Sequence, residues 1–380
     1  MELLKTSTEK RTAVMYGAGK IGRGFIGQVF HDSGFEVVFI DIDKDVISAI
    51  NKRNSYTQLI IDGESVQRRE ITAVRAVDGR NKDAVAREIA DCCIMAVSVG
   101  AVVLPHIAPF LAHGLALRMK SLNILVCENL VHAPDVLKGL VAKHIDDHAN
   151  LDHVGFVGAT IGRMVPVVSN EERASDPALI AVESFCTLPI DVDAVVTDMP
   201  LLQHTILCSP FAFEEGKKLY IHNMGHALSA YFGFLHGFEF VWQAMEDESI
   251  YRQVRCAMSA TVEALARKYN EDRTCLTAYM DDLLSRFGNK GLGDRIDRVG
   301  GDPMRKLAPG DRLMGAIDLC KEQGIDYSPI LPGIAAALRF DATNDPSVSM
   351  MRERVNEQGI VGFLMEFCGL LKEDAMQCNV

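Results

Sequence analysis

The chain has 380 residues, of which 48% are apolar and 24% are charged. At about 150 residues per domain, this length predicts two or three domains with a large buried core, and the composition excludes a disordered chain, a coiled coil and a small disulfide-stapled module. The 39 basic and 51 acidic residues give a net charge of −12, which repels the phosphate backbone of nucleic acids. We therefore expect a globular protein that has no nucleic-acid partner.

The ten cysteines form no CxxC pair and lie mainly inside apolar runs. We expect them to be reduced and mostly buried, as in the cytosol. The start of the chain, MELLKTSTEKR, is too polar for a secretory signal, and no window reaches the roughly 18 uninterrupted apolar residues of a membrane span. These features predict a cytoplasmic protein that does not enter a membrane.

A glycine-rich motif follows the first predicted strand. Residues 12–16 read TAVMY, an apolar run typical of a buried parallel strand, and the next six residues read GAGKIG, a GxGxxG motif. In a dinucleotide-binding fold, Gly17 would allow the tight turn, Gly19 would let the pyrophosphate approach the backbone, and Gly22 would let helix and strand pack closely. We expect the cofactor phosphates to contact Gly17, Gly19, Lys20, Ile21 and Gly22.

An acidic residue ends the second predicted strand. Residues 36–40 read EVVFI, and Asp41 comes 19 residues after Gly22, where a carboxylate accepts hydrogen bonds from the adenine ribose of NAD. The same carboxylate could instead lie in solvent or cap the helix that starts near Asp43. We predict NAD as the cofactor, with Lys44 close enough to leave some tolerance for NADP.

Two further strand-like runs, at residues 92–97 and 122–127, alternate with helical stretches near 102–112 and 133–147. This alternation predicts an α/β domain, a Rossmann-type doubly wound parallel sheet.

Ligands of such sheets bind outside the carboxyl ends of the strands. We therefore expect Ser98, Val99 and Gly100, which follow one strand, to lie beside the nicotinamide half of the cofactor. Glu128 and Asn129, which follow the next strand, are expected at the same edge. Ordinary turn and capping roles explain these last two residues equally well.

From about residue 195 the pattern becomes mostly α-helical, with helical periodicities near 226–244, 249–269, 275–287, 310–322 and 349–372. We predict an NAD-binding Rossmann-type domain over residues 1–195 and a helical substrate and catalytic domain over 196–380, with the substrate bound between them.

The second half carries a lysine, an asparagine and a histidine at the spacing KxxxxNxxH, namely Lys218, Asn223 and His226. On a regular α-helix, Asn223 and His226 lie one turn apart on one face, and Lys218 lies about two turns before His226. Because helical side chains lean toward the N-terminus, we expect Lys218 and His226 to converge on a ligand near Asn223 without touching each other. The alternatives are a snorkelling surface lysine and a satisfied core histidine, and His222 is expected to be structural.

Four segments, GAGKIGRGFIG, VCENL, KLYIHNMGH and RKLAPGDRL, together resemble the polyol-specific long-chain dehydrogenases and reductases over residues 12–340. The resemblance implies reversible, metal-independent hydride transfer between NAD and a sugar alcohol. It is closest to the branch that interconverts mannitol 1-phosphate and fructose 6-phosphate. The resemblance also implies catalytic roles for Lys218 as general acid/base, for Asn223 and Asn129 as donors to the substrate oxygen, and for His226 as a ligand of a substrate hydroxyl. Such a lysine needs a pKa lowered from about 10.4 to nearer 7–8, which a water-poor cleft supplies.

The chain departs from the family pattern at three places. Gly162 stands where the family usually has an aspartate, Gly301 stands where it has an arginine, and Asn289-Lys290 replaces Asn-Pro. These departures leave open which substrate the protein binds, whereas the hydride chemistry that the resemblance implies is unaffected. A hexuronate reductase acting on fructuronate or tagaturonate, and a catalytically silent NAD(H)-binding sensor, are therefore the alternative functions.

A phosphorylated substrate needs a basic receptor for its dianion. The candidates in the second half are Arg295, Arg298, Arg305, Lys306 and Arg312, of which Arg305 and Lys306 lie in the family-like RKL segment and are preferred. Exposed ion-paired surface is the alternative for all five. The sequence leaves open which cation binds the phosphate, and whether the protein is a monomer or a dimer.

Overall fold

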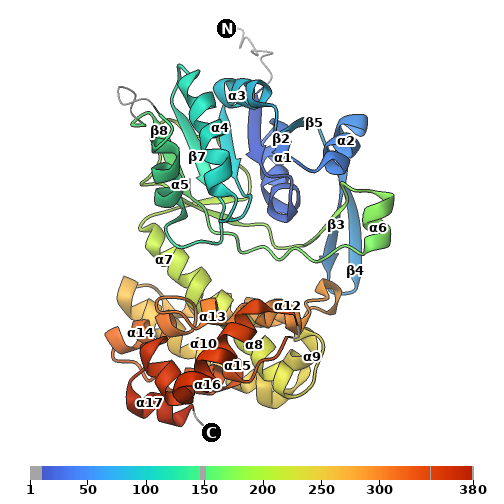
Figure 1. Ribbon diagram of the computed structural model, residues 1–380. Helices are drawn as coiled ribbons and strands as arrows, with labels where there is room; N and C mark the ends of the chain where they lie inside the picture. The colour runs from blue at the N-terminus through green and yellow to red at the C-terminus, as the bar shows by residue number, and fades with distance from the viewer. Residues whose placement is uncertain (1–10, 146–150, 343, 379–380) are drawn as a thin grey trace. The chain divides into compact units, whose positions relative to one another are not determined.

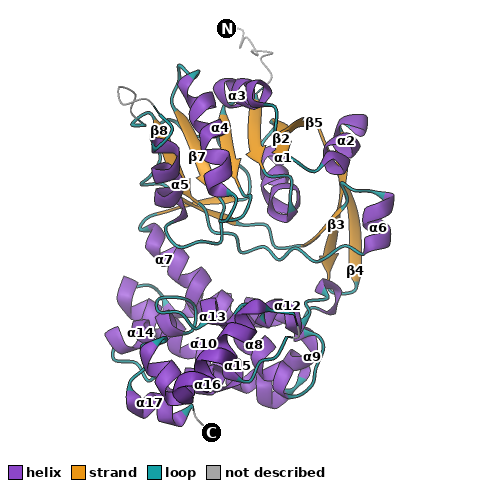
Figure 2. Cartoon of the chain, viewed as in Figure 1, coloured by secondary structure: helices purple, strands orange, loops and turns teal. Residues whose placement is uncertain are grey.

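The structure, a computed structural model, describes residues 11–145, 151–342 and 344–378 (Figure 1). The chain divides by its internal packing into two compact units, of which the first ends at Phe211 and the second begins at Ala212. Every strand of the described ranges lies before residue 209, and the second unit is helical (Figure 2). Among the described helices, none is long and apolar enough to cross a membrane.

The first unit is built on a six-stranded sheet of order β5-β2-β1-β6-β7-β8, in which all neighbours run parallel. Its strands are β1 (Thr12–Tyr16), β2 (Glu36–Asp41), β5 (Val74–Asp78), β6 (Ile94–Val97), β7 (Leu122–Val126) and β8 (Val154–Gly158). The chain moves outward from β1 to one edge and then returns to build the other half, which is the order of dinucleotide-binding sheets. The predicted Rossmann-type domain is confirmed.

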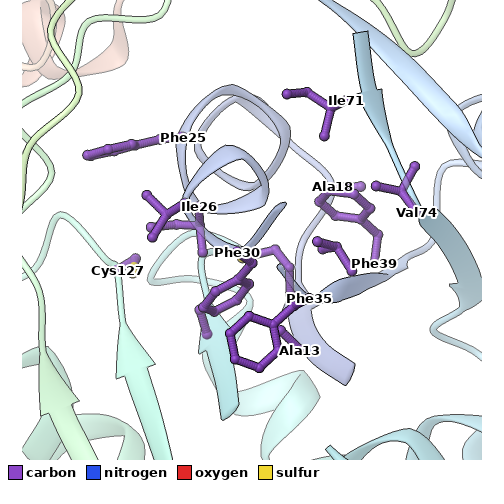
Figure 3. Close-up of a cluster of buried hydrophobic side chains, with 14 of the residues drawn as sticks. Ala13, Ala18, Phe25, Ile26, Phe30, Phe35, Phe39, Ile71, Val74 and Cys127 are labelled. Atoms are coloured by element: carbon purple, nitrogen blue, oxygen red, sulfur yellow. The ribbon is translucent and has the colours of Figure 1, made fainter. Parts of the chain in front are cut away.

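Both faces of this sheet are buried, because successive strand residues point to opposite sides. Ala13 and Met15 belong to one hydrophobic core, and Val14 and Tyr16 belong to another. In the first core, shown in Figure 3, Phe25 and Phe30 of the first helical segment gather with Phe39 of β2. Burial on both faces explains why the strands read as continuous apolar runs in the sequence.

Helices cover the two faces of the sheet. The first core takes residues from α1 (Gly27–Asp32) and α2 (Lys44–Arg53), and the second takes residues from α3 (Lys82–Asp91), α4 (Leu104–Ala116) and α5 (Ala133–Ala142). The predicted helices near 102–112 and 133–147 correspond to α4 and α5, although α5 ends at Ala142 and residues 146–147 of that prediction lie outside the described residues.

Besides β5, β8 and α3, two smaller sheets and a short helix in the first unit were not predicted. In one sheet, β3 (Ser55–Asp62) pairs with β4 (Ser65–Thr72) antiparallel and with β9 (Ile180–Glu183) parallel. In the other, β10 (Leu188–Asp191) pairs parallel with β11 (Thr205–Cys208). The short helix α6 (Asn170–Ser175) precedes β9.

The segment after residue 195 is held to the first unit. The Nδ2 atom of Asn123 in β7 donates to the carbonyl of Thr197 at 2.9 Å, and its Oδ1 accepts from the N–H of Val196 at 3.1 Å. Together with the β10–β11 pair, these bonds explain why the packing divides the chain after Phe211, whereas the sequence pattern changes near 195.

The second unit consists of helices: α7 (Phe211–Gly216), α8 (Met224–Leu235), α9 (Val241–Glu246), α10 (Glu248–Tyr269), α11 (Arg273–Phe287), α12 (Ile296–Gly300), α13 (Pro303–Lys306), α14 (Met314–Glu322), α15 (Leu331–Leu338), α16 (Pro346–Glu366) and α17 (Lys372–Gln377). The predicted helix near 226–244 is two helices, because the chain turns at Gly237 with φ +74°. The stretch near 349–372 is likewise interrupted at Gly359, with φ +73°.

All ten cysteines are free thiols. Five of them are buried, two are half-buried and three are exposed, so the expectation that most would be buried holds for only half. Burial raises the pKa of Cys320 to about 12, which keeps that thiol protonated and unreactive.

Candidate functional site

In the glycine loop after β1, two of the three glycines of the GxGxxG motif stand where no other residue would fit. Gly17 has φ +103°, and a Cβ atom there would lie 2.1 Å from the carbonyl oxygen of Ser98. A Cβ atom on Gly22 would lie 1.9 Å from the carbonyl oxygen of Gly17. A Cβ atom on Gly19 would meet nothing within 4 Å, so the backbone there is open to a ligand. The loop therefore fits a bound pyrophosphate in the way that the motif predicts.

The helix that follows starts at Lys20, which is exposed, and passes through a π-helical turn at Gly22–Ile26 before α1. The N-terminus of a helix attracts anions through its backbone N–H groups and its dipole. Arg23 lies buried in the π turn, where its Nε donates to the carbonyl of Ala18 at 2.6 Å and its Nη1 donates to the carbonyl of Pro177 at 3.1 Å. Arg23, which was not predicted as a site residue, thus links the glycine loop to the segment before β9.

Asp41, at the end of β2, accepts three backbone hydrogen bonds. Its Oδ2 accepts from the N–H of Ala18 at 2.6 Å, and its Oδ1 accepts from the N–H groups of Ile42 at 2.7 Å and Asp43 at 2.9 Å. A carboxylate has about four lone-pair positions, so one remains for a ribose hydroxyl. Asp43, not Asp41, caps α2. Asp41 therefore shapes the loop and can still bind a ribose.

The ends of β6 and β7 are joined by one carboxylate. The Oε1 atom of Glu128 accepts from the N–H groups of Val99 at 2.7 Å and Gly100 at 3.0 Å. Burial raises the pKa of Glu128, and the two backbone bonds offset only part of that rise. Asn129 beside it is exposed, and Ser98 donates its N–H to the carbonyl of Tyr16 at 2.9 Å. The two loops predicted at this edge thus lie together.

In the second unit, the lysine and the asparagine of KxxxxNxxH contact each other. The Nζ atom of Lys218 donates to Oδ1 of Asn223 at 2.8 Å. On a regular α-helix, five residues advance about 140° past a full turn, so these side chains would point in different directions. The segment Lys217–Asn223 is instead π-helical, and its wider turn brings residues i and i+5 together. The regular α-helix assumed in the sequence analysis is wrong here.

His226 lies in the first turn of α8 and is held from two sides. Its Nε2 lies 3.0 Å from Oδ2 of Asp294, and its ring stacks on Phe287 at 4.8 Å between centroids and 9° between planes. Asp294 also pairs with Arg298. Burial tends to raise the pKa of Asp294, but His226 and Arg298 outweigh it and lower that pKa. Asp294 and Phe287 could not be predicted as neighbours of His226, because nothing in their local sequence pattern relates them to it.

His222 is buried on the same helical stretch. Burial, followed by the charge of Lys218, lowers its pKa well below the ordinary value, so the ring is neutral. Its Nδ1 has no hydrogen-bond partner among the described residues. The structural role expected for His222 stays a prediction.

The five candidate phosphate receptors lie in different surroundings. The four arginines each have carboxylate partners: Arg295 with Glu239 and Asp297, Arg298 with Asp294, Arg305 with Asp302, and Arg312 with Asp311. Lys306 is buried, and desolvation together with the charges of Arg312 and Arg305 lowers its pKa to about 7. The preferred pair thus combines an exposed, ion-paired Arg305 with a buried Lys306.

Two of the departures from the family pattern have close neighbours. A Cβ atom on Gly162 would lie 3.3 Å from a ring carbon of Phe185. A Cβ atom on Gly301 would lie 3.3 Å from Oδ2 of Asp345. A longer side chain at either position would therefore press on the aromatic ring or on the carboxylate.

Comparison with known proteins assigns the chain to a family. Residues 11–204 match the mannitol dehydrogenase Rossmann domain, and residues 211–358 match the mannitol dehydrogenase C-terminal domain. The chain belongs to the mannitol dehydrogenase family. It is an oxidoreductase that acts on a CH–OH group, as the resemblance of its motifs implied.

Curated relatives within the mannitol dehydrogenase family cover almost the whole chain. A mannitol-1-phosphate 5-dehydrogenase from Shouchella clausii (strain KSM-K16) is 35% identical over 95% of this chain and 97% of its own. Another from Caldanaerobacter subterraneus subsp. tengcongensis is 36% identical over 95% and 94%. These relatives identify the chain as a polyol dehydrogenase.

Solved structures share the fold. Mannitol 2-dehydrogenase from Pseudomonas fluorescens, in a ternary complex with NAD and D-mannitol, has a TM-score of 0.76 at 17% identity, covering 97% of this chain and 91% of that one. A substrate-free D-sorbitol dehydrogenase has a TM-score of 0.78, also at 17% identity, covering 97% and 92%. The fold of this mannitol dehydrogenase family member is therefore that of known polyol dehydrogenases.

Proposed function

We propose that the protein is an NAD-dependent dehydrogenase that interconverts D-mannitol 1-phosphate and D-fructose 6-phosphate, with Lys218 as the general acid/base. The observation that carries the chemistry is the contact between Lys218 and Asn223 on the π-helical turn. The two mannitol-1-phosphate 5-dehydrogenases that match almost the whole chain support the choice of substrate.

Lys218 and Asn223 have different roles at the reacting oxygen: Lys218 transfers the proton, and Asn223 donates hydrogen bonds. The neutral amine of Lys218 removes the hydroxyl proton during oxidation and returns it during reduction. When charged, the amine of Lys218 can only donate hydrogen bonds, so the atom of Asn223 that it faces is Oδ1. The Nδ2–H₂ group of Asn223 is then left for the substrate. Two donor hydrogens there stabilise the negative charge that develops on the substrate oxygen. Asn129 is proposed as a second donor to the same oxygen, and His226 as a ligand of a substrate hydroxyl.

The cofactor site is proposed on the glycine loop and the strand ends. Gly17, Gly19 and Gly22 make the turn, and the helix from Lys20 and Ile21 faces the phosphates. When bound, a nicotinamide cofactor accepts the hydride from the carbinol carbon. The carboxylate of Asp41 favours NAD for two reasons. Its remaining lone pair can accept a hydrogen bond from a ribose hydroxyl, and its negative charge repels the additional phosphate of NADP. A Rossmann-fold relative of this architecture is known in complex with NAD and D-mannitol, which supports the same cofactor class.

The phosphate of the substrate is proposed to bind at Lys306, with Arg305 beside it. Lys306 is buried and has a pKa of about 7. A phosphate dianion bound beside it would compensate the charge of the ammonium group and raise the pKa of Lys306. Arg305, which is exposed and contacts Asp302, would supply a second cation.

The test is the oxidation of NADH by the purified full chain with fructose 6-phosphate, fructose and fructuronate in parallel, with a chelator present and with NADPH as a second cofactor. We expect rapid oxidation of NADH with fructose 6-phosphate and much slower rates with fructose, fructuronate and NADPH. Turnover with fructuronate alone would identify a hexuronate reductase. NADH binding without turnover of any of the three would overturn the catalytic assignment in favour of a silent sensor.

A further inference from the structure

The surroundings of His226 suggest a specific role for a residue outside the KxxxxNxxH motif. Asp294 lies just before α12 and is 68 positions further along the chain than His226. Its side chain is almost fully buried and places Oδ2 3.0 Å from Nε2 of His226, while its other oxygen contacts Arg298. A buried carboxylate with two cationic or donor partners favours its ionised form, and the pKa of Asp294 is lowered because His226 and Arg298 outweigh its burial.

The ring of His226 has little freedom to turn. It stacks on Phe287 at 4.8 Å with nearly parallel planes, and Nε2 is buried 3.0 Å from Oδ2 of Asp294, at ion-pair distance but without the geometry of a hydrogen bond. Within the described residues, Nδ1 of His226 makes no hydrogen bond and is not among the buried unpaired atoms. One nitrogen therefore faces a carboxylate, and the other remains for a ligand.

A carboxylate accepts hydrogen bonds and cannot donate one when ionised. It therefore favours the histidine tautomer that carries its proton on the facing nitrogen, which here is Nε2. In that tautomer Nδ1 holds a lone pair.

We propose that Asp294 is a positioning residue that keeps the proton of His226 on Nε2, so that Nδ1 accepts a hydrogen bond from a hydroxyl of the polyol substrate. The inference rests on the proposed function, in which His226 touches the substrate. It adds a specificity: the group that meets Nδ1 is a hydroxyl, which can donate, and not a carbonyl or carboxylate oxygen, which can only accept. Sugar alcohols and ketoses carry such a hydroxyl next to the reacting carbon.

The first measurement is the ¹⁵N NMR signature of the imidazole of His226 in the full-length protein labelled at histidine, assigned with the variant His226→Gln. The expected result, recorded at a pH where the ring is neutral, is a proton on Nε2. A ring protonated on Nδ1 in the unmutated protein would overturn the proposal without any variant. Since this readout needs no substrate, it stands apart from a failure of the proposed function, which would appear as no NADH oxidation with any ketose.

The second measurement uses Asp294→Asn, whose amide can donate to Nε2 and so favours the opposite tautomer. We expect the NMR signature to switch to Nδ1–H and kcat/KM for the ketose to fall about 10–100-fold, with NADH affinity unchanged. Asp297→Asn is the matched control, because Asp297 lies three residues away but is exposed and pairs with Arg295. A folded Asp294→Asn protein that keeps both the Nε2–H tautomer and full kcat/KM would refute the role of Asp294.

Discussion

The Nζ atom of Lys218 lies 2.8 Å from Oδ1 of Asn223, five residues further along a π-helical turn. This contact orients the amide of Asn223 so that its two donor hydrogens face away from the lysine. An amine and a pair of hydrogen-bond donors are thereby placed side by side on one helical element. π-Helical turns often occur at functional sites, and here one coincides with the proposed catalytic motif.

Replacing Lys218 tests the acid/base role. Lys218→Ala should lower kcat about 10²–10⁴-fold, because the hydroxyl proton then has no acceptor, while NADH affinity stays the same. Steady-state kinetics and NADH fluorescence titration measure the two effects. Lys217→Ala is the matched control, since Lys217 pairs with Glu214 at 2.6 Å and should affect stability more than kcat. A Lys218→Ala enzyme with near-normal kcat would show that another group moves the proton.

Replacing Asp41 tests cofactor selection. Asp41→Asn removes the charge but keeps one oxygen as an acceptor for backbone N–H groups, whereas Asp41→Ala removes the acceptors of all three bonds. We expect Asp41→Asn to raise KM for NADH about tenfold and to improve kcat/KM for NADPH. Asp41→Ala should do the same and also lower Tm, because the glycine loop loses its anchor. An unchanged ratio of NADH to NADPH use in Asp41→Asn would contradict selection by this carboxylate.

Glu128→Gln tests the link between the β6 and β7 loops. The carboxyl pKa of Glu128 is raised in the folded protein, so its protonated form contributes stability that is lost as the pH rises through that pKa. Glutamine stays neutral, and its one oxygen can still accept from Val99 and Gly100, as Oε1 does now. The variant should therefore raise Tm by about 1–3 °C at pH 8 and leave it unchanged near pH 4. Thermal scans at both pH values would decide, and a lower Tm at pH 8 would contradict this account.

Lys306→Met tests the phosphate receptor. Because the folded pKa of Lys306 is lowered from 10.5 to about 7, its burial costs stability fully below pH 7, and the cost fades as the pH rises toward 10.5. Methionine removes that charge, so the free energy of unfolding should rise by roughly 2 kcal/mol at pH 6.5 and little at pH 10. At the same time, KM for fructose 6-phosphate should rise at least about tenfold with NADH affinity unchanged. Urea denaturation and kinetics measure the two effects, and an unchanged KM would exclude Lys306 as the receptor.

Much of the first unit could be predicted from local patterns. The apolar runs at Thr12–Tyr16 and Glu36–Asp41 with the glycines between them predicted the start of a Rossmann-type sheet, since a parallel strand buried on both faces reads as a continuous apolar run. The small sheets β3–β4–β9 and β10–β11 could not be predicted in the same way. Their strands mix polar and apolar residues. β3 and β4 follow each other directly in the chain, but β9, which completes their sheet, comes from a distant part of it.

In the candidate site, too, the local features could be predicted and the long-range contacts could not. The sequence by itself determined the family, the glycine loop and the spacing of Lys218, Asn223 and His226, because motifs are short-range features of the chain. Only the tertiary structure decided that Lys218 bonds to Asn223 across a π-helical turn, and that Asp294 and Phe287 hold His226. Backbone hydrogen-bond pattern and long-range packing set these contacts, and neither is encoded in the spacing of the residues that make them.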